Sequence, residues 1–290
     1  MFAFVRRATV LSALALLTLA TTAAAQDAAP DRDDEVIDDR AIDPAQPDFL
    51  VVNLPTTLRL PQWRGALRVS HRFTRALGDG SFKDLAGDGF GTDFGALIGL
   101  EFRFGLPMGA QVGVFRTSEK TVEFFTQKEI VRERRRMPIG IAAFASAEGS
   151  DNFDSPRASA FGVVGSRSIA HRGSVYVQPF YVRNTNPGLI PSEEHDELGN
   201  HIAYRDTTML GIGGRFSVVR NLYVVGEYAA RVHGYDGIAL KSFAVEKVVG
   251  GHAFQINFSN ALGMSLADVA RGAASDDHWY LGFNLSRKFY

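Results

Sequence analysis

The residues with the greatest potential for chemistry lie in a polar stretch near position 200. His195 and His201 stand beside four acidic residues, at positions 193, 194, 196 and 197. Two imidazoles and a carboxylate could bind Zn²⁺ or a similar ion. Neither an H-x-x-x-H nor an H-E-x-x-H spacing fixes them, so a solvated polar loop is the preferred interpretation. His195 and His201 are weak metal candidates, and no cofactor is expected.

The sequence contains no convincing catalytic constellation. His71 is unusual because the alternation of its segment places it on an apolar face beside Val69 and Phe73. A local bulge or an interfacial bond explains this position more simply than catalysis does. Ser259 follows His252 by seven positions, which is a coincidence of sequence without the neighbours of an activated nucleophile. We therefore expect no enzyme, with a lipid hydrolase or protease embedded in the outer membrane as an alternative.

Strands rather than helices must position these residues, because side chains alternate with a period of two from Arg64 onward. Ile98, Leu100 and Phe102 share one face of such a segment, and Glu101 and Arg103 share the other. Alternation and turn residues together predict twelve strands, at 64–76, 92–104, 109–117, 121–132, 137–146, 156–169, 174–184, 207–218, 221–232, 238–248, 252–260 and 277–290.

The lengths of the predicted connections support this count. Those after the second, fourth, sixth, eighth and tenth strands are short, and those after the first, fifth, seventh and eleventh are long. Outer-membrane barrels have an even number of strands, short periplasmic turns and longer external loops. The pattern therefore predicts a twelve-stranded, antiparallel, up-and-down transmembrane β-barrel. Loop 184–206 would lie outside the cell and the arginine cluster at 132–136 in the periplasm.

Composition excludes several other classes of protein. The chain of 290 residues has no cysteine, which excludes a disulfide framework, a zinc ribbon and thiol catalysis. Its 31 basic and 32 acidic residues give a net charge of −1, so no overall field attracts nucleic acid.

The N-terminal region has the features of an exported protein. Arg6 and Arg7 precede an apolar run that ends in small residues at 23–25, which predicts a signal peptide over residues 1–25. Residues 26–49 contain nine acidic residues and two arginines, which predicts a disordered acidic leader. The barrel would then occupy residues 50–290.

Several stretches resemble a family of bacterial β-barrel proteins. These stretches are Asn53-Leu54-Pro55-Thr56-Thr57, Ser70-His71-Arg72-Phe73, Gly99-Leu100-Glu101-Phe102-Arg103-Phe104-Gly105, Gly251-His252-Ala253-Phe254-Gln255, Phe258-Ser259-Asn260 and Trp279-Tyr280-Leu281-Gly282-Phe283-Asn284-Leu285-Ser286-Arg287. From residue 53 to residue 290, the chain resembles the membrane or secreted β-barrel proteins of diderm bacteria known as a domain of unknown function. The resemblance implies an outer-membrane barrel and no activity.

The inward-facing residues are the candidate functional set. Alternation predicts that charged side chains of both signs line the lumen, namely Arg68, Arg72, Glu101, Arg103, Glu123, Arg215, Glu227 and Arg231. A twelve-stranded barrel is wider than one filled by its own side chains and narrower than a large porin. We therefore expect a narrow channel for a small solute, with a weak preference for anions because arginine is in slight excess.

Location and partners follow from this interpretation. We expect the outer membrane of a diderm bacterium, with membrane lipid, the barrel assembly machinery and a small solute as partners. Phe283, Leu285, Phe289 and Tyr290 form the expected C-terminal assembly signal. The alternatives are a structural or adhesive barrel without transport and a soluble periplasmic β-barrel or sandwich.

Overall fold

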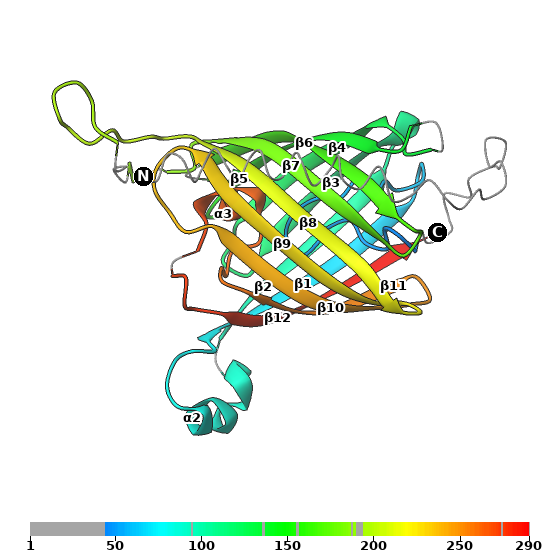
Figure 1. Cartoon of the computed structure of the whole chain (residues 1–290), viewed down its shortest axis with the longest axis horizontal. Coiled ribbons are helices and arrows are strands. Elements are labelled where there is room, and N and C mark those ends of the chain that lie inside the picture. Colours follow the sequence, from blue (N-terminus) through cyan, green and yellow to red (C-terminus); the bar gives the residue numbers. More distant parts are fainter. Residues whose placement is uncertain are drawn as a thin grey trace. The chain divides into compact units, whose positions relative to one another are not determined.

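The chain forms a closed antiparallel barrel (Figure 1). The computed structural model describes residues 44–93, 95–134, 137–154, 157–186, 188–189, 194–273 and 275–289. Each strand pairs with its neighbours in the chain, and β1 pairs with β12 to close the barrel. The strands are β1 (Gly65–Ala76), β2 (Ala96–Gly105), β3 (Ala110–Thr117), β4 (Val122–Val131), β5 (Gly140–Gly149), β6 (Arg157–Ile169), β7 (Gly173–Arg183), β8 (Thr207–Val219), β9 (Leu222–His233), β10 (Leu240–Val249), β11 (His252–Ser259) and β12 (Tyr280–Phe289).

All twelve predicted strands are confirmed, each with boundaries close to those expected. We call the end of the barrel that carries the short connections 106–109, 170–172, 220–221 and 250–251 the turn end, and the opposite end the loop end. The signal peptide and residues 26–43 of the predicted leader lie outside the described residues.

The two faces of the barrel wall have opposite polarity. On β2, Ile98, Leu100 and Phe102 are exposed on the outer face, whereas Glu101 and Arg103 are buried on the inner face. Other strands repeat the pattern, with exposed Phe243 and Val245 on β10, for example. An apolar belt of this extent on the outside is typical of a barrel that faces lipid, and it disfavours the soluble barrel.

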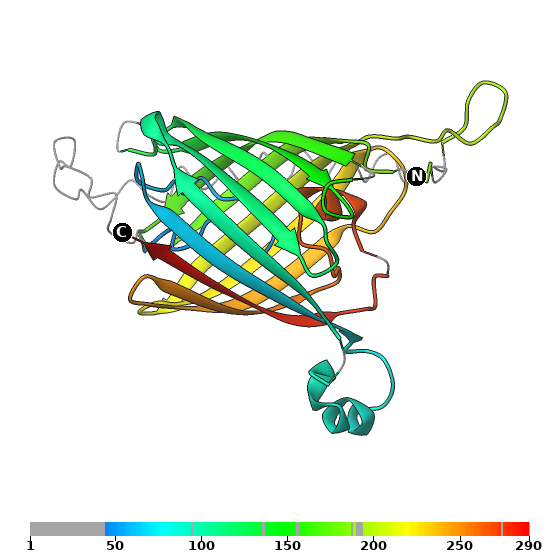
Figure 2. The same cartoon turned by 180° about the vertical axis from the view of Figure 1, so that it is seen from behind.

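A segment that precedes β1 folds back inside the barrel at the turn end (Figure 2). Residues 44–60, here called the lumenal hairpin, are nearly all buried. The hairpin turns at residues 51–54, where the Val51 N–H donates to the Leu54 carbonyl at 2.8 Å and the Thr56 N–H donates to the Phe49 carbonyl at 2.9 Å. The prediction that the disordered leader extends to residue 49 is therefore wrong for residues 45–49. They are ordered because the barrel wall supplies hydrogen-bond partners that a free acidic chain lacks.

A short helix occupies the loop end of the lumen. Helix α3 (Leu266–Arg271) belongs to the connection between β11 and β12 and begins with a capping box, in which Ser265 and Asp268 bond each other's backbone N–H groups. Its Ala267, Val269 and Ala270 side chains are buried in the main apolar cluster. The hairpin and α3 thus fill the lumen from opposite ends.

The remaining helical elements lie in connections. The β1–β2 connection contains helix α2 (Phe82–Gly87) and the 3₁₀ turn η1 (Gly89–Gly91), and η2 (Pro107–Gly109) joins β2 to β3. Among the described residues, none of the helices is long and apolar enough to cross a membrane.

Candidate functional site

The tip of the lumenal hairpin binds one carboxylate on the barrel wall. The backbone N–H groups of Val52, Asn53 and Leu54 donate to Glu227 of β9 at 2.9, 2.9 and 3.0 Å. The Asn53 side-chain amide donates to the same carboxylate at 2.8 Å. Successive N–H groups that converge on an anion form a binding concavity, here occupied by a side chain of the protein itself. Glu227 therefore fixes the position of the tip within the lumen.

Three of the predicted lumenal arginines also bind the hairpin. Arg68 donates to the Val52 carbonyl at 2.7 Å, Arg72 to the Asn53 side-chain oxygen at 3.0 Å, and Arg215 to the Leu50 carbonyl at 2.5 Å. All three are buried. Their side chains lie inside the barrel, where in this closed arrangement they contact protein rather than a solute.

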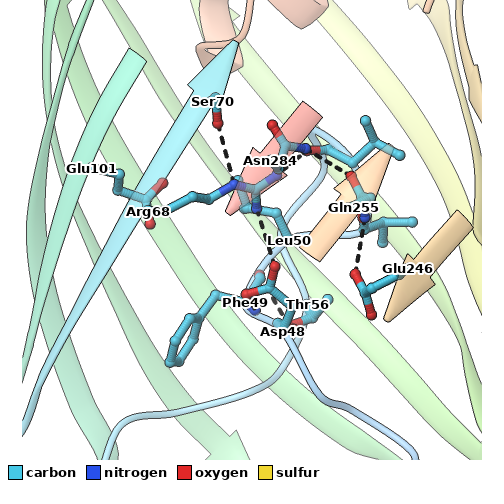
Figure 3. Close-up of polar contacts among 12 residues, drawn as sticks. Asp48, Phe49, Leu50, Thr56, Arg68, Ser70, Glu101, Glu246, Gln255 and Asn284 are labelled. Atoms are coloured by element: carbon cyan, nitrogen blue, oxygen red, sulfur yellow. Dashed lines mark hydrogen bonds and ion pairs between the residues drawn. The ribbon is translucent and has the colours of Figure 1, made fainter. Parts of the chain in front are cut away.

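Two acidic partners balance part of this positive charge. Arg215 pairs with Glu246 of β10 at 2.9 Å, with both side chains fully buried. The Arg68 guanidinium lies 3.7 Å from the carboxylate of Asp48 in the hairpin, and the two side chains point toward each other inside the barrel (Figure 3). Buried charges are stable only when paired and hydrogen-bonded, so these partners explain how the arginines remain inside the barrel.

Glutamines on several strands bind the backbone carbonyls of the hairpin. Gln255 donates to the Val51 carbonyl at 2.9 Å, Gln178 to that of Pro55 at 3.0 Å, and Gln127 to that of Thr56 at 2.9 Å. These carbonyls lie outside the twelve strands of the barrel. The wall therefore replaces the hydrogen bonds that water would make.

The apolar residues of the tip pack against glycines on β8. A Cβ atom added at Gly213 would lie 3.1 Å from Val51 Cγ2, and one added at Gly211 would lie 2.9 Å from Leu54 Cδ1. The two glycines therefore make room for the hairpin on that side of the lumen.

Phe49 of the hairpin lies close to two cationic side chains. The Arg103 guanidinium lies 5.1 Å from the centre of its ring, and the Lys288 ammonium lies 5.3 Å from it. Lys288 also donates to the Pro47 carbonyl at 2.6 Å. Arg103 is additionally hydrogen-bonded to Glu101, its neighbour on the inner face of β2.

Arg231 lies at the loop end of the lumen, opposite the hairpin. Its guanidinium donates to the carbonyls of Ala270 and Arg271, both at 2.8 Å, and so caps the C-terminus of α3. The Arg271 side chain bonds Glu148 of β5 and Asp268 of α3, each at 2.7 Å. The Arg231 side chain therefore holds α3 in the lumen.

A cavity of about 50 Å³ remains between the two closures. Its wall comes from β1–β5, its turn-end side from the hairpin residues Val52 and Asn53, and its loop-end side from Met264 and Leu266. The last two predicted lumenal residues, Glu101 and Glu123, both line it. The predicted set is thus divided among the hairpin, α3 and this cavity.

The metal and catalytic candidates do not form a site. His195 and His201 face each other with ring centres 4.2 Å apart in an exposed loop, but no group of three or more potential metal ligands occurs among the described residues. His71 lies on the outer face, stacked on Phe283 at 4.8 Å. His252 and Ser259 are at opposite ends of β11, about 23 Å apart at the usual rise per residue.

The residues of the expected C-terminal assembly signal lie on β12. Phe283 and Phe289 are exposed on the outer face of β12, and Leu285 shares that face. Tyr290 lies outside the described residues. Their role in assembly remains a prediction.

The comparison with protein families matches almost the whole barrel. A family described as "Membrane bound beta barrel domain (DUF5777)" matches residues 48–289. No curated protein matches the chain.

Several solved outer-membrane proteins are similar in structure. They include the KdgM porin in complex with disordered oligogalacturonate (TM-score 0.48, 9% identity, 78% of this chain and 99% of that one). The NanC porin has a TM-score of 0.46 and 8% identity over 78% of this chain and 99% of its own. The COG4313 outer membrane channel from Pseudomonas putida F1 has a TM-score of 0.44 and 8% identity, over 79% and 97% of the two chains.

Proposed function

Because the chain belongs to the family of membrane-bound beta barrel domains, we propose that it is an outer-membrane channel for small solutes, closed by its own lumenal hairpin. The observation that carries this proposal is the way the hairpin is held. Side chains of the wall bind its backbone groups through hydrogen bonds that water can replace. A segment held in this way is a removable closure and not a part of the wall.

The connection of the hairpin to the wall also suits a gate. Both of its arms lie at the turn end, where Tyr223 donates to the Pro44 carbonyl at 2.8 Å and the Leu60 N–H donates to Gln111 at 3.1 Å. The tip can therefore move in and out through the turn end alone. Neither end of the chain has to pass through the barrel for this movement. Displacement of the hairpin would expose Arg68, Arg72 and Arg215 to the lumen.

The opened lumen would have a weak preference for anions. Five arginines stand against three glutamates in the predicted lumenal set, Arg68, Arg72, Glu101, Arg103, Glu123, Arg215, Glu227 and Arg231. A small excess of fixed positive charge favours anions without excluding cations.

Conductance in planar lipid bilayers tests the proposal. A variant without residues 44–58 should give a single-channel conductance several times that of the full chain. A matched control without the exposed loop segment 194–202 should conduct like the full chain. In the variant without the hairpin, replacing Arg72 and Arg103 with Ala should shift the reversal potential in a salt gradient toward cations.

A structural barrel without transport is the second candidate, because the lumen is filled from both ends. It would be favoured if the variant without residues 44–58 folds, as judged by heat-modifiable migration on gels, and still gives no conductance.

A further inference from the structure

The cavity between the hairpin and α3 contains a buried carboxylate group that is only partly satisfied. Glu123 of β4 is 5% exposed, and its Oε1 atom has no hydrogen-bond partner among the described residues. Its other contacts are with Ser146 and the backbone of Leu266. A buried carboxylate without a donor has to be neutralised, either by a proton or by a bound cation.

No basic side chain in the cavity is available to neutralise this carboxylate. Arg103 is the only cationic residue among those that line the cavity, and it is hydrogen-bonded to Glu101. Glu148 and Asp268 add further negative potential at Glu123. Both of these carboxylates already bind Arg271. With Glu123 ionised, the cavity therefore has an excess of negative charge.

The remaining lining of the cavity is suited to an organic cation. The rings of Phe115 and Phe144 line it, together with the Gln127 amide and the Ser70 hydroxyl. The Phe125 ring also lines it, but the Arg103 guanidinium already lies over that ring, 4.4 Å from its centre. Aromatic faces attract cations, and the neutral oxygens can accept N–H bonds. The volume of about 50 Å³ corresponds to roughly four water positions, which limits the ligand to a very small ion.

We infer that this cavity binds a small primary ammonium ion, with the Glu123 carboxylate as its anionic partner. A divalent metal ion is a poorer match, because the described residues do not bring three or more potential ligands together. The site exists with the hairpin in place. It does not depend on the channel opening and is tested separately from conductance.

Thermal unfolding of the purified, detergent-folded full chain tests the site. The temperature at which the heat-modifiable band is lost should be higher in methylammonium chloride than in choline chloride of equal concentration, because choline is too large for the cavity. A ligand that binds only the folded state raises stability with the logarithm of its concentration once that concentration exceeds Kd. The Glu123→Gln variant should lose this difference. The Glu119→Gln control, which removes a charge from the exposed β3–β4 turn, should retain it.

A direct binding measurement on the unmodified protein covers the case in which Glu123→Gln does not fold. Saturation transfer from the barrel to the methyl protons of methylammonium should be detectable by NMR. Ammonium chloride should compete for the site and choline chloride should not. The inference is overturned if no transfer occurs, if both salts compete equally, or if the folded Glu123→Gln variant responds to methylammonium like the unmodified protein.

Discussion

The carboxylate of Glu227 accepts the backbone N–H of Asn53 at 2.9 Å, although 174 positions separate the two residues in the chain. This contact joins the middle of β9 to the tip of the lumenal hairpin. The same carboxylate also binds the N–H groups of Val52 and Leu54, so one wall side chain satisfies three successive backbone donors. Glu227 should therefore control both the stability of the closed barrel and the release of the hairpin.

Replacing Glu227 with Ala should destabilise the closed state by about 3 kcal/mol, because three buried N–H groups lose their acceptor. Thermal loss of the heat-modifiable band measures the change. Glu227→Gln keeps one carbonyl acceptor and should have a smaller effect. An unfolding temperature for Glu227→Ala equal to that of the unmodified protein would show that the hairpin is held elsewhere.

A cysteine pair at Val51 and Gly213 should lock the hairpin. A Cβ atom at Gly213 would lie 3.1 Å from Val51 Cγ2, close enough for a disulfide, and the chain has no other cysteine. We expect low conductance under oxidising conditions and a rise after reduction with dithiothreitol. The Val51→Cys single variant is the control and should not respond to reductant. An oxidised double variant that conducts like the reduced one would contradict gating by the hairpin.

Replacing Arg231 with Ala should release α3 from the loop end. The change leaves the partly buried carbonyls of Ala270 and Arg271 without their donor, at a cost of about 1 kcal/mol for each group. Limited proteolysis should then cut within 260–279 faster than in the unmodified protein. Arg231→Lys retains the charge but cannot bond both carbonyls in the same planar geometry, so an intermediate rate is expected. Equal cleavage rates in all three proteins would contradict the capping role.

Protease added to intact cells should cut within loop 184–206 and spare the connection at Arg134. The first lies at the loop end and the second at the turn end. Immunoblotting of the fragments measures the result, and permeabilised cells, where both ends are accessible, provide the control. Cleavage at Arg134 alone in intact cells would reverse the orientation.

The barrel wall could be predicted from the sequence because lipid and the lumen impose opposite polarity on alternate residues. On β2, Leu100 and Phe102 are exposed on the outer face, whereas Glu101 and Arg103 are buried on the inner face. The same alternation of polarity occurs on other strands. The inward orientation of the charged set follows from the same alternation.

The partners of these charges could not be predicted in the same way. Arg68 and Arg215 bind backbone carbonyls, which every residue type possesses and which leave no signature in the sequence. One signal for the hairpin is the apolar run at positions 50–52, directly after an acidic stretch. Read together with Gly211 and Gly213, it could have suggested a segment packed inside the barrel.

The position of both hairpin arms at one mouth determines how the closure responds to mechanical load. Tension applied to the chain before Pro44 would first reach the contacts of Pro44, Ala45 and Pro47 with Tyr223, Ser174 and Lys288. The Glu227 contacts would bear load only after these had broken. The hairpin would therefore peel from the wall bond by bond, which requires a much smaller peak force than shearing all contacts together. A modest pull from the turn end could open a barrel whose wall remains intact.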